Sequence, residues 1–300
     1  MTEPIVELEA AFARYEALRS RLPRAEFPRE SRRVPDLGAL TDRYDVFALD
    51  AFGVLNVGER PIPGAPERVA ALRAAGKRLF VLTNGATHRR VDALRKYGAL
   101  GFDFTGEEVV SSRDLAAEAL RGDGRLWAAA AGPAPRFGDL DLRVGDLLAE
   151  DALHERAEGF LLLSASGWNR RRQDRLVAAL RERPRRVVCA NPDLVAPREA
   201  GLTLEPGWWA HDLADRTGVE PDLFGKPYGG AFAAIRARCP ETPPERIVMV
   251  GDTLHTDILG GRAAGFAAAL VLGHGLLAGR EPTGFVARSG IVPDWLCETT

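Results

Sequence analysis

Short apolar runs that end in polar residues constrain the fold of this chain more than any other feature of its sequence. Three such runs can be read together with the residues that follow them: 46–49 before Asp50, 79–82 before Thr83-Asn84, and 247–250 before Gly251-Asp252. Helix-like patterns follow the first two runs and stop at the glycines at positions 76 and 98, and similar patterns flank the third run. Continuous apolar strands alternating with helices are typical of a parallel sheet covered on both faces. The sequence therefore predicts an α/β fold with a doubly wound parallel sheet.

Residues 113–220 form a block with strand and helix patterns of its own. Apolar runs at 160–163 and 187–190 are candidate strands, and a helix pattern at 170–182 joins them. We therefore expect a second α/β domain inserted into the first, which is divided into residues 44–112 and 221–300.

The N-terminal residues 1–43 are expected to lie outside both domains. Apolar side chains recur every three or four residues over 2–21, which predicts a helix there. Residues 22–44 carry three prolines among charged residues and predict an extended connector.

Composition excludes several classes of protein. The 300 residues are 46% apolar and 27% charged with a net charge of −2, which is ordinary for a globular protein with a sizeable core. This balance gives no general attraction to nucleic acid or membrane, and the sequence shows no signal peptide or membrane-spanning run, so neither partner is expected. The three cysteines are far apart and form no C-x-x-C pair, which favours a reducing, cytoplasmic setting.

The polar residues that end the three apolar runs are expected to meet, because ligands of a parallel sheet bind beyond the carboxyl ends of its strands. Lys226 adds a cation just before the helix that precedes the third run, and it is one of only three lysines against 37 arginines. Carboxylates of Asp50 and Asp252 suit Mg²⁺, which needs one or two carboxylates together with a substrate phosphate. Lys226 and Thr83 would hold an anionic group beside that cation.

Four motifs resemble the signature motifs of the haloacid dehalogenase superfamily, in the same order: LDAFGVL (49–55), LTNGA (82–86), GKP (225–227) and GDTLHTD (251–257). The chain is similar to class IIA of that superfamily, whose phosphatases carry a C2-type cap between the second and third motifs. Asn191-Pro192-Asp193 resembles the cap signature of that class. The resemblance implies a Rossmann-like core with an inserted cap, Mg²⁺-dependent hydrolysis of a small phosphorylated substrate, and a homodimer as a further expectation.

The resemblance also assigns roles to single residues. Asp50 would be the nucleophile that forms an aspartyl-phosphate, and Lys226 would neutralise charge beside it. The transferring phosphoryl oxygens would be bound by Thr83, Asn84 and Gly85. The metal would be bound by Asp50, Asp252, Asp257 and the backbone carbonyl of Phe52. The substrate would be contacted by the cap residues Asn191 and Asp193.

Phe52 departs from the pattern, because phosphatases of the superfamily have a second aspartate at this position as general acid and base. A phenylalanine cannot transfer a proton, and general acid–base catalysis contributes about 10²–10⁴-fold to a rate. Three interpretations stay open: a phosphatase in which His255 or His88 substitutes, a phosphometabolite-binding or regulatory protein with little turnover, and a dehalogenase, whose halide leaving group needs no proton. The dehalogenase is disfavoured, because those enzymes place the cap between the first and second motifs and use no Mg²⁺.

Overall fold

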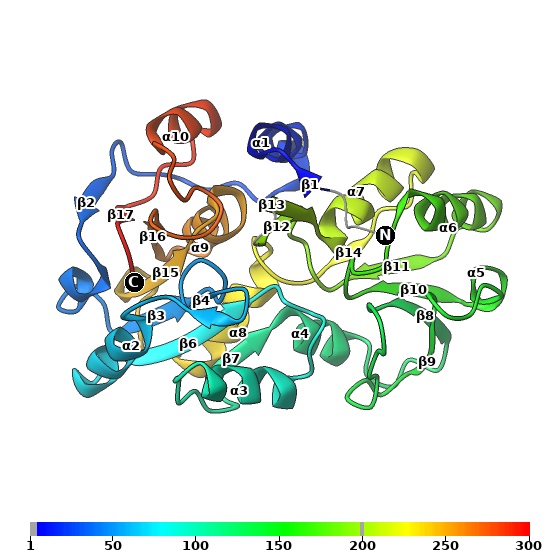
Figure 1. Ribbon diagram of the computed structural model, residues 1–300, viewed down its shortest axis with the longest axis horizontal. Helices are drawn as coiled ribbons and strands as arrows, with labels where there is room; N and C mark the ends of the chain where they lie inside the picture. The colour runs from blue at the N-terminus through cyan, green and yellow to red at the C-terminus, as the bar shows by residue number, and fades with distance from the viewer. Residues whose placement is uncertain (1–4, 199–200) are drawn as a thin grey trace.

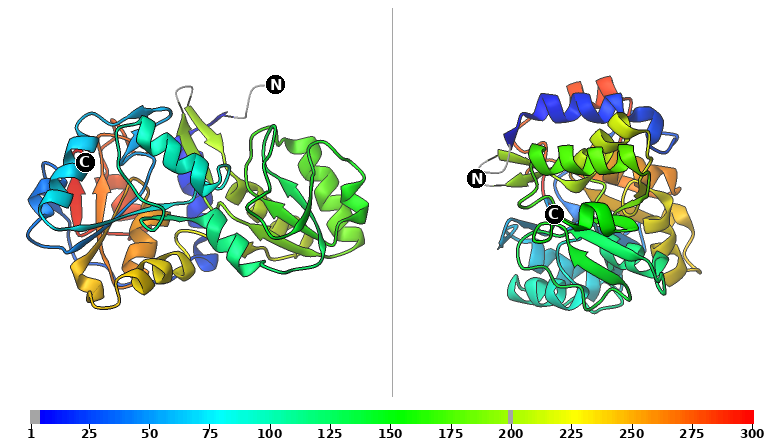
Figure 2. Two further views of the ribbon diagram at one scale, coloured as in Figure 1. Left: turned by 90° about the horizontal axis from the view of Figure 1, so that it is seen from below. Right: turned by 90° about the vertical axis from the view of Figure 1, so that its right-hand side faces the viewer.

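The computed structural model describes residues 5–198 and 201–300 and forms two α/β lobes. Each lobe is built on its own parallel sheet, and the views in Figure 1 and Figure 2 place the core at one end of the long axis and the inserted cap at the other. The superfamily core and the inserted cap expected from the sequence are both present.

The core sheet of the described residues has seven strands, all parallel. In spatial order these are β2 (Arg32–Val34), β17 (Trp295–Cys297), β16 (Ala267–Val271), β15 (Ile247–Gly251), β3 (Val46–Leu49), β6 (Arg78–Thr83) and β7 (Val109–Ser111). Leu49 of β3 pairs with Val250 of β15 on one side and with Val81 of β6 on the other. This register puts the residues that follow β3 and β15, and those that end β6, at one edge of the sheet.

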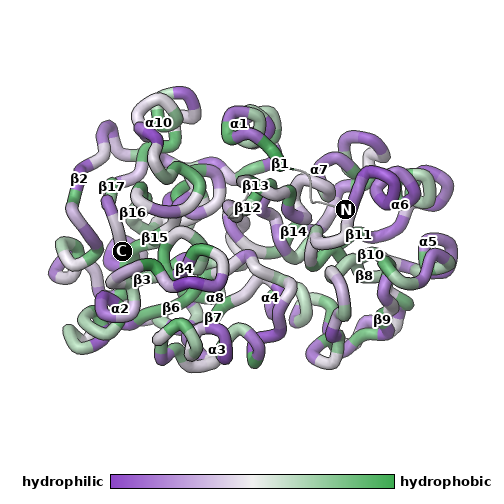
Figure 3. The backbone as a smooth tube through the Cα atoms, in the orientation of Figure 1, coloured by the Kyte–Doolittle hydropathy of each residue, from purple (hydrophilic) through white to green (hydrophobic). Residues whose placement is uncertain are grey.

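Apolar side chains alternate between the two faces of the core sheet, as strands buried on both sides require. Phe47 and Leu49 of β3 pack on the face covered by α2 (Ala65–Ala74) and α3 (Arg90–Ala99). Val46 and Ala48 pack on the opposite face, against α8 (Gly229–Arg238). In Figure 3 the central strands are correspondingly apolar, whereas polar residues gather on the outer helices.

The cap sheet has five parallel strands, in the order β14 (Asp222–Leu223), β11 (Arg186–Cys189), β10 (Gly159–Leu162), β8 (Leu126–Ala130) and β9 (Arg143–Asp146). Helices α6 (Arg170–Glu182) and α7 (Pro206–Thr217) cover one face. The other face packs against α4 (Ser112–Ala119) and Ala86 of the core.

Smaller elements complete the described residues: the hairpin β4 (Asn56–Val57) and β5 (Arg60–Pro61), α5 (Leu153–Arg156), a π-helix (Leu254–Ile258) continued by α9 (Leu259–Ala263), α10 (Thr283–Ser289), and short 3₁₀ turns at Arg19–Arg21, Leu37–Leu40 and Pro244–Arg246. No helix formed by the described residues combines the length and the apolar character needed to cross a bilayer.

The N-terminal segment differs from the prediction of one helix over residues 2–21. Helix α1 covers only Leu8–Ala17, whereas Ile5–Val6 forms strand β1 and residues 2–4 lie outside the described residues. β1 pairs with β13 (Gly201–Leu204), which pairs in turn with β12 (Val195–Arg198) of the cap. The helical spacing of Ile5 was misleading because this residue gains backbone partners at a sheet edge and keeps its side chain 58% exposed.

Three further boundaries were wrong. The connector predicted over residues 22–44 contains β2, which extends the core sheet by pairing with β17. Helix α3 continues through Gly98 to Ala99, and the left-handed conformation that marks its end is at Gly101, with a φ of +90°. At the other end of the insert, β14 belongs to the cap sheet, three residues beyond the expected boundary at 220.

Candidate active site

Three strand ends bring the candidate catalytic residues together. Asp50 follows β3 directly, and its backbone N–H donates to the carbonyl of Val250 at 2.8 Å. Asp252 follows β15, and Thr83 is the last residue of β6. The convergence expected from the sequence is therefore present, over a separation of about 200 residues along the chain.

Lys226 lies between two carboxylates of this cluster. Its Nζ is 2.6 Å from Oδ1 of Asp50 and 2.6 Å from Oδ1 of Asp257. The side chains of Lys226 and Asp257 are only 2% and 1% exposed, whereas Asp50 lines a cavity. The carboxylate of Asp50 is therefore accessible from the cavity, while the buried ammonium of Lys226 holds this carboxylate in place.

The cluster perturbs its own protonation. Burial raises the pKa of Asp50, an effect that Lys226 opposes and Asp257 reinforces. Burial likewise raises the pKa of Asp252, and the charges of Asp257 and Asp50 add to that shift. Burial acts to lower the pKa of Lys226, but the carboxylates of Asp257 and Asp50 outweigh it and hold that pKa above its usual value. Lys226 therefore stays charged beside the carboxylates.

Local hydrogen bonds fix the two aspartates of the fourth motif. Asp257 Oδ2 accepts the backbone N–H of Thr253 at 3.1 Å, and Asp252 accepts the Thr253 hydroxyl at 2.8 Å and the Leu276 N–H at 2.7 Å. Gly275 makes this approach of Leu276 feasible: it has a φ of +80°, and a Cβ there would lie 2.0 Å from Asp252 Oδ2. Any larger residue would displace the carboxylate.

The carboxylates fit a divalent cation. Oxygen atoms of Asp50, Asp252 and Asp257 lie within 4.8 Å of one another. When all three are ionised, Lys226 balances only one charge, and Asp252 pairs with no cation of the described residues. Hard oxygen donors with an excess of negative charge are the setting that Mg²⁺ prefers. Phe52 lies in the loop after Asp50, and its backbone carbonyl as a further ligand stays a prediction.

The second motif divides between the cavity and its support. Thr83, Asn84 and Gly85 line the cavity, and Thr83 Oγ1 accepts the N–H of Gly85 at 3.1 Å. The side-chain amide of Asn84 instead binds the backbone of Lys226. Its Oδ1 accepts the backbone N–H of Lys226 at 2.7 Å, and its Nδ2 donates to the backbone carbonyl of Lys226 at 2.9 Å. The Asn84 side chain therefore fixes the backbone of Lys226, and contact of that side chain with phosphate stays a prediction.

The cap contributes Asn191 and Asp193 to the lining of the same cavity. Asp193 Oδ1 accepts a hydrogen bond from Asn84 Nδ2 at 2.8 Å, so the cap touches the second motif directly. Asn191 holds its own loop, because its Nδ2 donates to Glu205 at 3.0 Å and its Oδ1 accepts the Asp193 N–H at 3.1 Å. Burial raises the pKa of Asp193 well above its usual range.

Phe52 lines the cavity at the position where a general acid was expected from the resemblance. The ammonium of Lys96 lies over its ring, 5.6 Å from the centroid, and also contacts Glu59 at 2.8 Å. A cation over an aromatic face is a favourable contact, which accounts locally for a phenylalanine at this site.

The two histidines considered as substitutes for the acid differ in position. His255 is only 2% exposed, its Nε2 contacts Glu16 at 2.5 Å, and burial lowers its pKa to about 4. It faces α1, not the cavity, so the expectation that it could serve the leaving group was wrong. His88 lines the cavity and is exposed, and burial of part of the ring lowers its pKa.

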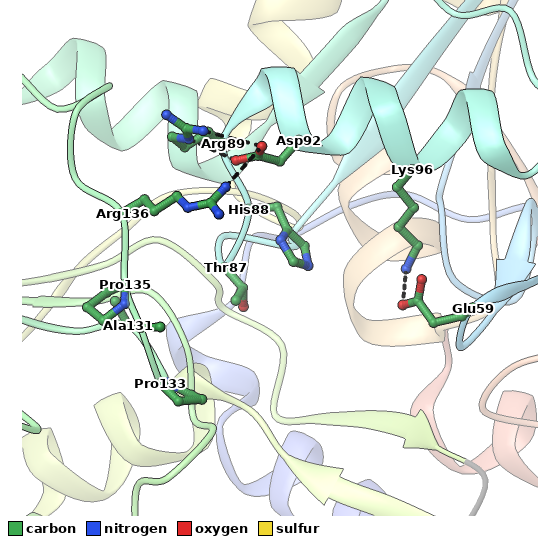
Figure 4. A pocket seen from close by; sticks show the side chains of 11 residues that line it. Glu59, Thr87, His88, Arg89, Asp92, Lys96, Ala131, Pro133, Pro135 and Arg136 are labelled. Atoms are coloured by element: carbon green, nitrogen blue, oxygen red, sulfur yellow. Dashed lines mark hydrogen bonds and ion pairs between the residues drawn. The ribbon is translucent and has the colours of Figure 1, made fainter.

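The catalytic cavity, of about 340 Å³, is joined to a second cavity of about 490 Å³. The two share Glu59, Thr87, His88 and Lys96. Figure 4 shows this second cavity between α3 and the loop after β8, with the His88 ring between Thr87 and Lys96. Lys96 and Glu59 were not predicted from the motifs, although the scarcity of lysine in this chain was a signal for Lys96.

Family models match the two halves of the core. One, described as haloacid dehalogenase-like hydrolase, matches residues 47–134, and a second model of the same kind of hydrolase matches residues 223–283. The residues between the matches form most of the cap. The division of the core on either side of an insert is thus reproduced by the comparison.

Two known relatives are similar to this chain over most of its length. A glycerol-3-phosphate phosphatase of Gallus gallus is 30% identical, with 87% of this chain and 91% of the relative covered. A D-glycerol 3-phosphate phosphatase of Mycobacterium tuberculosis is 30% identical over 78% of this chain, which spans only 64% of that relative.

Among solved structures, a "possible sugar phosphatase" of Cytophaga hutchinsonii superposes with a TM-score of 0.78 at 27% identity, covering 89% of this chain and 97% of the other. Neighbours of the para-nitrophenylphosphatase type share the fold, including the cap. The chain belongs to the haloacid dehalogenase-like hydrolases, in the class IIA group whose cap lies between the second and third motifs.

Proposed function

We propose that this chain is a Mg²⁺-dependent phosphatase of small phosphorylated metabolites that acts through an aspartyl-phosphate at Asp50. The observation that carries the proposal is the buried Lys226, whose Nζ is 2.6 Å from both Asp50 and Asp257, next to a carboxylate that lines the cavity. Phosphoryl transfer needs mainly positioning and charge neutralisation, which this arrangement supplies.

In the first step an oxygen of the Asp50 carboxylate forms a bond to phosphorus while the bond from phosphorus to the leaving oxygen breaks. The leaving oxygen takes a proton from water as it departs, because Phe52 has none to give. The hydroxide left behind is neutralised by the proton that the attacking water loses in the second step. In the second step a water oxygen attacks the same phosphorus, the bond to Asp50 breaks, and inorganic phosphate leaves with the carboxylate restored. Lys226 holds Asp50 in place and offsets negative charge in both steps.

Asp50, Asp252 and Asp257 would hold Mg²⁺, with Thr253 and Leu276 fixing the aspartates of the fourth motif. The cation would supply a positive charge beside the transferring phosphoryl oxygens. Thr83 and Gly85 line the cavity next to Asp50 and would bind those oxygens.

The size of the site supports a small substrate. About 340 Å³ over the nucleophile, continued by the second cavity, is at the scale of small-molecule pockets. Asp193 and Asn191 close the site from the cap and would face the leaving group. The relatives named as glycerol-phosphate phosphatases agree with a substrate of this size.

Phe52 favours a second candidate function, a phosphometabolite-binding protein with little turnover. The position of the usual general acid is filled by the Phe52 ring, which lies against the Lys96 ammonium. Binding of a phosphorylated metabolite needs no general acid, whereas its rapid hydrolysis does. A dehalogenase is disfavoured, because the cap follows β7 of the core and is thus inserted after the second motif. The three carboxylates, which would hold a divalent cation, also argue against it.

Release of phosphate from a panel of esters that includes glycerol 3-phosphate and para-nitrophenyl phosphate, with Mg²⁺ and with EDTA, tests the proposal. We expect Mg²⁺-dependent release that Asp50→Asn abolishes and Asp45→Asn, an exposed change before β3, leaves intact. Release that survives Asp50→Asn would refute the nucleophile. Tight binding of esters without turnover would establish the second candidate instead.

A further inference from the structure

Helix α1 lies between the two lobes and contacts both. On the core side, Phe12 packs edge-to-face on Phe285 of α10 with ring centroids 5.2 Å apart, and Glu9 pairs with Arg288 at 2.8 Å. On the cap side, Arg14 pairs with Asp215 of α7 at 2.5 Å. Figure 1 shows α1 between α10 and α7, above the junction of the lobes.

Two further contacts attach the N-terminal segment to the cap. Arg21, in the 3₁₀ turn after α1, also pairs with Asp215 at 2.7 Å. At the other end of the helix, β1 adds to the hairpin of β12 and β13, with Ile5 opposite Thr203 and Val6 opposite Leu202. The segment is therefore held by the cap on both sides of α1.

Tyr15 is the residue of α1 that contacts loops of the active site from both lobes. Its hydroxyl accepts the backbone N–H of Leu194 at 3.1 Å, immediately after Asp193 in the cap. Its ring stacks on His255 at a centroid distance of 4.7 Å and an interplanar angle of 9°. His255 lies between Asp252 and Asp257 in the chain, and its Nε2 contacts Glu16 of the same helix.

We propose that Tyr15 is a positioning residue: it fixes the cap loop of Asn191–Leu194 relative to the loop of the fourth motif, so that the N-terminal segment is part of the active-site scaffold. The inference rests on the proposed function for its kinetic consequence, but not for its structural one. Leu194 is 1% exposed, so without the hydroxyl its N–H has no water to replace the lost acceptor. The loop would then shift, and with it the cap side chains that face the substrate.

Tyr15→Phe tests this role, with Tyr44→Phe as a matched control. Tyr44 is also a buried tyrosine whose hydroxyl accepts a buried N–H, from Trp295 Nε1 at 2.7 Å, but it precedes β3 at the end of the sheet opposite the active site. Both variants lose one buried acceptor, so a general loss of stability affects them alike.

Amide hydrogen exchange gives the first readout, because it does not depend on catalysis. We expect the Leu194 amide to be protected in the wild-type protein and in Tyr44→Phe, and to exchange at least tenfold faster in Tyr15→Phe. Should Tyr15→Phe fail to fold, an unprotected Leu194 amide in the wild-type protein would overturn the proposal.

Kinetics with para-nitrophenyl phosphate give the second readout. Displacement of groups that position a substrate costs about 10–100-fold in kcat/KM, and we expect this loss in Tyr15→Phe mainly as a raised KM. Tyr44→Phe should stay within twofold of the wild type. Equal kinetics and equal exchange in the two variants would overturn the proposal. If no variant, nor the wild type, releases phosphate, the proposed function fails, while the exchange result still decides the role of Tyr15.

Discussion

Lys226→Met removes the ammonium from the centre of the carboxylate cluster while keeping most of the side-chain volume. A unit charge pair at 2.6 Å attracts with about 6 kcal/mol at an effective dielectric constant of about 20, and Lys226 makes two such contacts. Desolvation of the buried ions offsets much of this attraction. Removal of one partner from a buried pair costs about 3–5 kcal/mol, which is the loss in the free energy of unfolding that we expect without divalent cations at pH 8.

Urea unfolding at equilibrium, in EDTA and in Mg²⁺, measures this loss. Mg²⁺ should restore part of the stability of Lys226→Met, because a cation then returns to the same carboxylates, and it should stabilise the variant more than the wild type. Phosphate release should nevertheless fall by about 10²–10³-fold, as for the loss of one group that stabilises transition-state charge.

Lys96→Met is the matched control for stability. Its ammonium pairs with Glu59, whose side chain is 82% exposed, so its loss should cost no more than about 1 kcal/mol. If Lys226→Met unfolds within 1 kcal/mol of Lys96→Met in EDTA at pH 8, the reasoning from a buried, net negative cluster is wrong.

Three further predictions follow from the same site. The pKa of Asp252 is raised to about 8 in the folded protein, so between about pH 4 and pH 8 the unfolded state ionises this group more readily, and the free energy of unfolding in EDTA should fall as pH rises. The increase in Tm on adding Mg²⁺ should be larger at pH 8 than at pH 5.5, and an equal increase would contradict the metal assignment. Phe52→Asp should release phosphate at least tenfold faster than Phe52→Asn, the control variant whose amide cannot act as a general acid. Equal rates in the two variants would refute the account of a missing acid. Gly275→Ala should displace Asp252 and weaken the binding of Mg²⁺ measured by calorimetry. Gly279 has a similar φ but open space around it, so the control Gly279→Ala should lower stability without weakening Mg²⁺ binding. Unchanged Mg²⁺ affinity in Gly275→Ala would show that the loop adapts.

The sequence predicted the core of this site because its signals are local. Asp50, Thr83 and Asp252 each end an apolar run, and parallel strands bring such ends together whatever lies between them. The cap insertion was also predictable, since helix α6 and the strands beside it carry clear patterns of their own.

The remainder depends on contacts between distant segments. Ile5 has helical spacing from Leu8 but forms a strand, because an unpaired edge at β13 offers backbone partners that no local pattern reveals. His255 lies two residues from Asp257 along the chain, yet it faces Tyr15 and Glu16 because the turn of the π-helix directs it to the side opposite the cavity. The hydrogen bonds by which the Asn84 amide holds the backbone of Lys226 were not predictable from the motif either, whereas its contact with phosphate stays a prediction.

The pairing of β1 with β13 has a consequence for the order in which the chain folds during synthesis. Ile5 cannot pair with Thr203 until that residue has left the ribosome, roughly 10–40 s later at a synthesis rate of 5–20 residues per second. The strand β2 waits longer still, because its partner β17 ends three residues before Thr300. The strands β1 and β2 are therefore synthesised long before their partners, and they have to stay unpaired until both lobes have formed.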